Sequence, residues 1–211
     1  MTSRPSALLR LAAAVALAAS LAGCVSLLPK QKPSPLYSFG ATPVATTQTT
    51  PAGGARVGVY RAGGMFQREA AGDRILTVTG AQAAYIAQAR WVGPAEVLFD
   101  AAVARAFDAS NRVRLIARGE PGRADYALRL DMRNFETRYA DKDGAPTVVV
   151  RLRAVVIRQA QAGEAAERIF EAQVPAADNR IHAIVAAYDK ALAQVLGDLM
   201  AWVEASASPR A

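Results

Sequence analysis

The sequence predicts an α/β fold of the α+β kind, a two-layer sandwich in which two main helices cover one mixed, mostly antiparallel sheet. Apolar and polar residues alternate over residues 125–139 and 147–159, which predicts two long strands. Apolar residues recur at spacings of three and four over 94–110 and 181–203, which predicts two amphipathic helices. A helix with one continuous apolar stripe needs a sheet to lie on, so the two observations together favour the sandwich.

The first 23 residues have the layout of a secretory signal. Two arginines precede an apolar stretch from residue 11 to about 19, which is shorter than the roughly 20 residues that span a bilayer. Leu21, Ala22 and Gly23 are small or aliphatic residues that a signal peptidase accepts, and Cys24 follows them directly. Cys24 is the only cysteine of the chain.

The order Leu-Ala-Gly-Cys resembles a bacterial lipoprotein signal, in which the cysteine is acylated and becomes the first residue of the mature chain. The thioether requires a thiol, so we expect Cys24 to be the lipid anchor. The alternative is an incidental small residue at the end of an ordinary signal. Val25 follows the cysteine in place of the aspartate that retains many lipoproteins at the inner membrane, so we expect the periplasmic face of the outer membrane.

Length and charge fit one exported domain. The chain has 211 residues and a net charge of +7, which falls to +5 without residues 1–23 because these hold two arginines and no acid. We expect a lipidated cysteine and tether over 24–35, one domain over 36–205 and a tail over 206–211. Cys24 leaves no thiol for a disulfide, so a packed core must stabilise the domain. Nucleic acid is a poor partner for an exported protein.

The first half of the domain reads as short strands followed by a helix. We predict strands at 36–40, 55–62, 73–79 and 83–91, and a loop at 41–54 that is rich in Thr, Pro, Ala and Gly. Pro94 is expected in the first turn of a helix over 94–110. The apolar stripe of that helix consists of Leu98, Ala102 and Ala106, with Phe99, Val103 and Phe107 beside them. A strand at 112–117 and a turn-rich connector at 118–124 follow.

A long hairpin forms the second half of the sheet. Even-numbered residues from Tyr126 to Met132 are apolar, whereas Phe135 and Tyr139 are odd-numbered, so we predict a β-bulge near Asn134. After a turn at 140–146, strand 147–159 places its even-numbered apolar residues on one face. We expect its Arg151 and Arg153 to meet Asp131 across the hairpin on the other face. A strand at 168–175 closes the sheet.

The last element is predicted to be a helix of more than 20 residues that starts at Asp178 or Asn179, both good N-cap residues. Its apolar stripe consists of Ile181, Ile184, Val185, Tyr188, Leu192, Val195, Leu196, Leu199 and Val203.

No catalytic, metal or cofactor site is predicted. The one histidine, His182, has no HxxH, CxxC or HExxH partner, and no serine lies in a GxSxG elbow. Asp141 and Asp143 begin like a calcium loop, but the glutamate at its twelfth position is missing, so a hairpin turn is favoured. An enzyme would have to use His182 or an unrecognised carboxylate. Trp91 and Trp202 are expected at the rim of the core, the alternative being contact with a partner or a lipid surface.

Four segments together resemble the ABC-type transport auxiliary lipoprotein family, the PqiC-like proteins: "QARWVGP", "ADYALRLDMRNFETRY", "PTVVVRLRAVVI" and "VAAYDKALAQVLGDLMAWV". The resemblance runs from the Cys24 signal to about Trp202. The positions that carry it, which we expect to be structural, are Trp91, Pro94, Asp125, Tyr126, Phe135 and Trp202.

The resemblance implies a non-catalytic accessory role. Members of that family work with an ABC ATPase, a permease and an MCE-domain protein to move phospholipids or other hydrophobic molecules between the two membranes. The lipoprotein would be the outer-membrane partner of the MCE-domain protein and could form a homo-oligomer. The alternative is an envelope lipoprotein that scaffolds other assemblies without handling lipid.

Overall fold

The structure, a computed structural model, describes residues 34–42, 56–117, 119–141, 144–160 and 165–207. The predicted signal peptide, Cys24 and nearly all of the tether lie outside the described residues, as do residues 43–54 of the predicted loop and Asp143. Ser34–Ala211 forms one compact unit.

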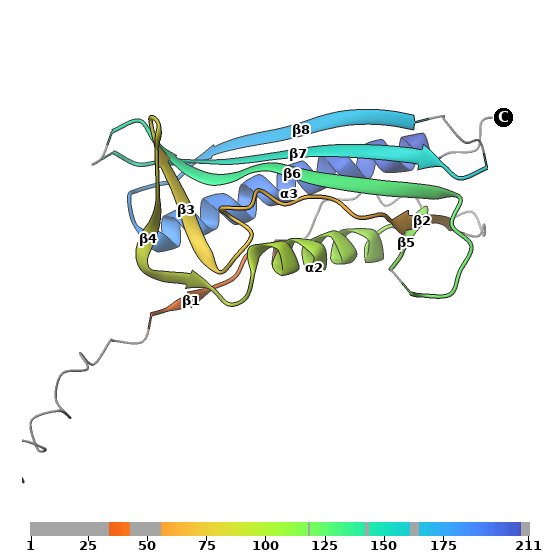
Figure 1. Ribbon diagram of the computed structural model, residues 1–211, viewed down its shortest axis with the longest axis horizontal. Coiled ribbons are helices and arrows are strands. Elements are labelled where there is room, and N and C mark those ends of the chain that lie inside the picture. The colour runs from red at the N-terminus through yellow and green to blue at the C-terminus, as the bar shows by residue number, and fades with distance from the viewer. Residues whose placement is uncertain (1–33, 43–55, 118, 142–143, 161–164, 208–211) are drawn as a thin grey trace, which may run out of the picture. The chain divides into compact units, whose positions relative to one another are not determined.

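Ten elements follow one another along this unit (Figure 1). In chain order they are β1 (Leu36–Tyr37), β2 (Val57–Arg61), β3 (Arg74–Thr79), β4 (Gln82–Trp91), α2 (Ala95–Asp108), β5 (Val113–Ile116), β6 (Tyr126–Tyr139), β7 (Thr147–Arg158), β8 (Ala165–Pro175) and α3 (Ile181–Ser206).

The strands form one mixed sheet of eight, built around β6. One edge of β6 pairs with β7, which pairs with β8, and these two antiparallel ladders are the longest of the sheet. The other edge is shared by two shorter parallel partners, β2 near Tyr126 and β3 near Thr137. β5 extends the sheet beside β2, and β4 and β1 extend it beside β3.

The two helices share one apolar core with the sheet, so the predicted two-layer sandwich is confirmed. α3 runs along β7 and β8, whereas α2 packs against β5 and α3 (Figure 1). The even-numbered apolar residues of β7 are all buried beneath α3: Val148, Val150, Leu152, Ala154 and Val156. The stripe of α3 is buried as the 3–4 spacing predicts, except that Ile181 and Val185 are half-buried.

The starts of both helices differ from the sequence prediction. Pro94 lies directly before the first helical residue of α2. α3 begins at Ile181 after an extended Arg180, and no side chain caps it. Asp178 accepts the Arg180 N–H, and the Asn179 side chain accepts a hydrogen bond from the Tyr139 hydroxyl. Both predicted N-cap residues were therefore wrong, because a local turn uses the Asp178 side chain and a tertiary contact uses that of Asn179.

The predicted bulge is present in the long hairpin. Met132 pairs with Leu152 and Asn134 with Arg151, which leaves Arg133 as the extra residue of β6. Asp131 lies opposite Arg153 and forms an ion pair with it at 2.9 Å, as expected. Arg151 instead pairs with Glu171 of β8 at 3.4 Å, so its predicted contact with Asp131 was wrong.

Candidate functional site

Two of the family-motif aromatics lie together in the centre of the core. Trp91 is 2% exposed, and its ring packs edge-to-face on Phe39 at 4.9 Å and on Tyr188 at 5.2 Å. Phe135 packs on the same Tyr188 ring at 4.7 Å. Burial raises the pKa of Tyr188, whose hydroxyl accepts a hydrogen bond from Thr137. Trp91 thus lies deeper than the rim expected for it, where it connects β4 to β6 and α3.

The remaining motif positions do not join this cluster. Trp202 is half-buried against Phe170, with ring centres 5.7 Å apart. At the start of β6, the Asp125 carboxylate pairs with Arg123 at 3.3 Å and accepts the Gly58 N–H. The Tyr126 ring next to it lies 5.6 Å from the Arg158 guanidinium. These contacts fix the path of the chain and bring no reactive groups together.

The described part of the chain contains no cluster of His, Cys, Asp or Glu that could hold a metal ion. His182 is exposed on the first turn of α3. Within the same residues, no helix is long and apolar enough to cross a membrane.

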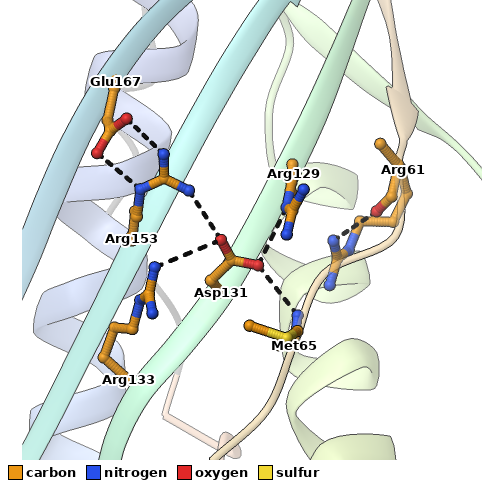
Figure 2. Close-up of polar contacts among 8 residues, drawn as sticks. Arg61, Met65, Arg129, Asp131, Arg133, Arg153 and Glu167 are labelled. Atoms are coloured by element: carbon orange, nitrogen blue, oxygen red, sulfur yellow. Dashed lines mark hydrogen bonds and ion pairs between the residues drawn. The ribbon is translucent and has the colours of Figure 1, made fainter.

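A polar cluster lies on the face of the sheet that points away from α3 (Figure 2). The alternation that buries Leu130 and Met132 beneath the helices turns Arg129 and Asp131 to the opposite face. Asp131 is nevertheless only 1% exposed, since three arginines and the segment after β2 surround it. A buried charge of this kind is stable only when it is paired and hydrogen-bonded.

Asp131 is held from three sides. Its Oδ1 accepts the Arg129 Nε–H and the Met65 N–H, both at 3.1 Å. Its Oδ2 accepts Nη1 of Arg153 at 2.9 Å, and Nη2 of Arg133 lies 4.0 Å away. Burial raises the pKa of Asp131, but the bonds from Arg129, Met65 and Arg153 outweigh it, so that pKa lies below its usual value. The carboxylate is therefore ionised at neutral pH.

Arg153 extends the cluster to the edge strand. Its Nε and Nη2 atoms donate to the two oxygens of Glu167 at 2.6 and 2.5 Å while Nη1 holds Asp131. The bonds to Glu167 and Asp131 raise the pKa of Arg153, and the same contact lowers the pKa of Glu167. A guanidinium bound bidentately on one side and singly on the other has little freedom to move.

A second buried carboxylate repeats the pattern beyond the bulge. Glu136 is 3% exposed and accepts hydrogen bonds from Gln67 at 2.9 Å, Arg138 at 2.7 Å and Asn134 at 3.3 Å. Burial raises its pKa, and these three bonds lower it further than burial raises it. Each buried acid therefore fixes arginines whose outer parts face solvent.

The sequence reasoning found Asp131 and Arg153 but missed Arg129, Glu136, Glu167 and Gln67. The alternation in β6, with its bulge, places Arg129 and Glu136 on the same face as Asp131, and with β7 it could have revealed an arginine-rich surface. The burial of the carboxylates depends on residues 62–67 lying along β6, which no local pattern reveals. Chemically, the arrangement offers fixed guanidinium donors and fully paired carboxylates, which suits recognition of anions better than proton transfer.

Comparison with known proteins identifies the family. A family model described as the ABC-type transport auxiliary lipoprotein component matches residues 67–199, which is more than half of the chain. Protein XCC0632 from Xanthomonas campestris is similar in structure, with a TM-score of 0.63 and 25% sequence identity over 82% of this chain and 92% of that one. An uncharacterized protein has a similar fold at a TM-score of 0.55 and 16% identity, over 72% and 92% of the two chains. No match was found among curated proteins. The matched segment includes Trp91, both buried carboxylates and most of α3, and this chain belongs to the ABC-type transport auxiliary lipoprotein family.

Proposed function

We propose that this protein is a lipid-anchored lipoprotein on the periplasmic face of the outer membrane. It serves there as a non-catalytic auxiliary component of an ABC transporter that works with an MCE-domain protein. The cargo is a phospholipid or another hydrophobic molecule that moves between the two membranes. The family match over residues 67–199 is the observation that carries the proposal. The paired state of the buried carboxylates supports a binding role over a catalytic one.

The anchor is assigned to Cys24, which follows the signal and precedes the compact unit by a short tether. The Cys24→Ser variant should remain unacylated and retain its signal peptide, because the thioether cannot form. Metabolic labelling with a palmitate analogue, together with the intact mass of the purified protein, measures both effects. A variant that is still processed and labelled would contradict the anchor.

The partnership is tested by crosslinking the tagged protein in cells and identifying what is purified with it by mass spectrometry. Recovery of an MCE-domain protein, with its permease and ATPase, is the expected result. Recovery of peptidoglycan or of outer-membrane structural proteins alone would favour the scaffold alternative. A deletion strain separates the two again, since a scaffold leaves the distribution of phospholipids between the membranes unchanged.

A further inference from the structure

We propose that the outer face of β6, β7 and β8 is where this protein docks an acidic surface of its partner protein in the transport assembly. This inference rests on the proposed function, because it names the contact surface of the same partner. We call this surface the arginine face, defined by Arg129, Arg133, Arg138, Arg151 and Arg153.

Neither of the described helices covers the arginine face. α3 packs on the other side of β7 and β8, and α2 lies against β5 and α3 (Figure 1). Four of the five arginine side chains are 46–49% exposed, and Arg153 is 26% exposed. Three strands of 11 to 14 residues present about 500 Å², the area of one side of a small, transient protein contact.

Three of the five arginines are fixed in place before any partner arrives. Arg153 is held by two carboxylates, Arg129 by Asp131, and Arg138 by Glu136 (Figure 2 for the first two). Ordering a long side chain at an interface costs about 0.5–1.5 kcal/mol, and this cost is largely met here within the folded domain. Arginine is one of the residue types enriched among the hot spots of protein interfaces.

The face also retains unused positive charge and hydrogen-bond donors. Around Asp131 there are three arginines, whereas Asp131 and Glu167 supply two negative charges, which leaves an excess of +1. Arg129 donates from Nε alone, and Arg133 approaches Asp131 no closer than 4.0 Å. Within the described residues, the outer N–H groups of these two arginines donate no other hydrogen bond. Carboxylates of an acidic surface would accept hydrogen bonds from these N–H groups, since the two parallel donors of a guanidinium match the two oxygens of a carboxylate.

The apolar neighbours favour a protein over a lipid. Ile169 is 48% exposed and Ile157 is 36% exposed, and both point from β8 and β7 to this face. Arginine beside a few aliphatic side chains is typical of protein interfaces. Two separate isoleucines on a sheet face cannot shelter acyl chains, although the same guanidinium groups could contact a phosphate headgroup.

A photo-crosslinking amino acid at Ile169, in the full acylated protein in cells, tests the face directly. The matched position is Ala201, which is exposed on the surface of α3 away from the sheet. We expect the MCE-domain protein to be captured from position 169 and not from 201. Capture from 201 alone overturns the arginine face and leaves the proposed function intact. Capture of a second copy of this chain or of phospholipid from position 169 also contradicts the arginine face as the docking surface. If neither position captures anything, the docking surface and the proposed function are both contradicted.

A charge reversal tests the role of the arginines. Arg133→Glu should lower the crosslinking yield from Ile169 at least about fivefold, because like charges repel across the contact. Arg168→Glu reverses a charge on the opposite face of β8 and should leave the yield unchanged. Thermal unfolding of both purified variants checks that each is folded. Equal losses in two folded variants, or a loss in neither, would overturn the assignment.

Discussion

At the scale of single residues, Asp131 is the buried charge at the centre of the arginine cluster, and its removal should affect stability most. Asp131→Ala leaves Nη1 of Arg153 and the Met65 N–H without their acceptor, so we expect the free energy of unfolding to fall by about 2–3 kcal/mol. Arg133→Ala is the matched control, because Arg133 is half exposed and 4.0 Å from the carboxylate, and it should cost under about 1 kcal/mol. Urea titration measures both. Similar losses would mean that Asp131 is not the centre of the cluster.

The same carboxylates predict how stability depends on pH. The pKa values of Asp131 and Glu136 are lowered in the folded protein, so the unfolded chain binds protons more readily at acidic pH. Their contribution is present above the usual carboxyl pKa of about 4 and is lost as the pH falls through the lower folded values. Thermal melts from pH 6 to pH 3 should show this loss, and Glu136→Gln should make it less steep. A variant that loses stability as steeply as the wild type would contradict the assignment.

At the scale of elements, the sequence predicted best what depends on local periodicity. The hairpin, its bulge and the stripe of α3 follow from spacings of two, three and four residues, which packing then reinforces. The start of α3 could not be predicted in this way, because Asn179 accepts a hydrogen bond from Tyr139, 40 residues away in the sequence. Arg151 forms its ion pair with Glu171 rather than with Asp131, since Glu171 lies directly opposite it on β8.

The segment between β2 and β3 is the element that completes the site. It lies along β6, where the Ala62 N–H bonds to Leu128 and the Met132 N–H bonds to Met65. A Cβ added at Gly64 would lie 1.8 Å from the Leu130 carbonyl oxygen, so this approach needs glycine. Gly64→Ala should therefore destabilise the domain by about 1–3 kcal/mol and weaken the Met65 contact with Asp131.

Gly93→Ala is the control for that substitution, because a Cβ there meets nothing within 4 Å. Urea unfolding of both variants measures the difference in stability. Hydrogen exchange at the Met65 amide then reports whether the bond to Asp131 has loosened. Equal stability of the two variants would show that the segment can move away from β6 without cost.

At the scale of the whole molecule, the sheet order was the part that sequence could not supply. β2 and β3 both pair with β6, although the first is separated from it by more than 60 residues. Such pairings depend on long-range packing, and they place Gln67 on Glu136 and Met65 on Asp131. The arginines were visible as a polar face in the sequence, whereas the carboxylates that fix them became a site only once this order was known.

Anchoring and folding should be separable in this molecule. The compact unit Ser34–Ala211 contains the whole described sheet, both helices and the arginine face. Nine residues lie between Cys24 and Ser34, so with the proposed anchor at Cys24 a fully extended tether would span about 35 Å. Anchoring therefore raises the local concentration of the domain without shaping it. We therefore consider residues 34–211 exported behind an ordinary signal peptide, without a lipidation site. This variant should melt within a few degrees of the acylated protein, and it should still crosslink through Ile169 to the purified partner. The same variant should fail to restore phospholipid distribution in a deletion strain, and full restoration would show that the anchor is dispensable.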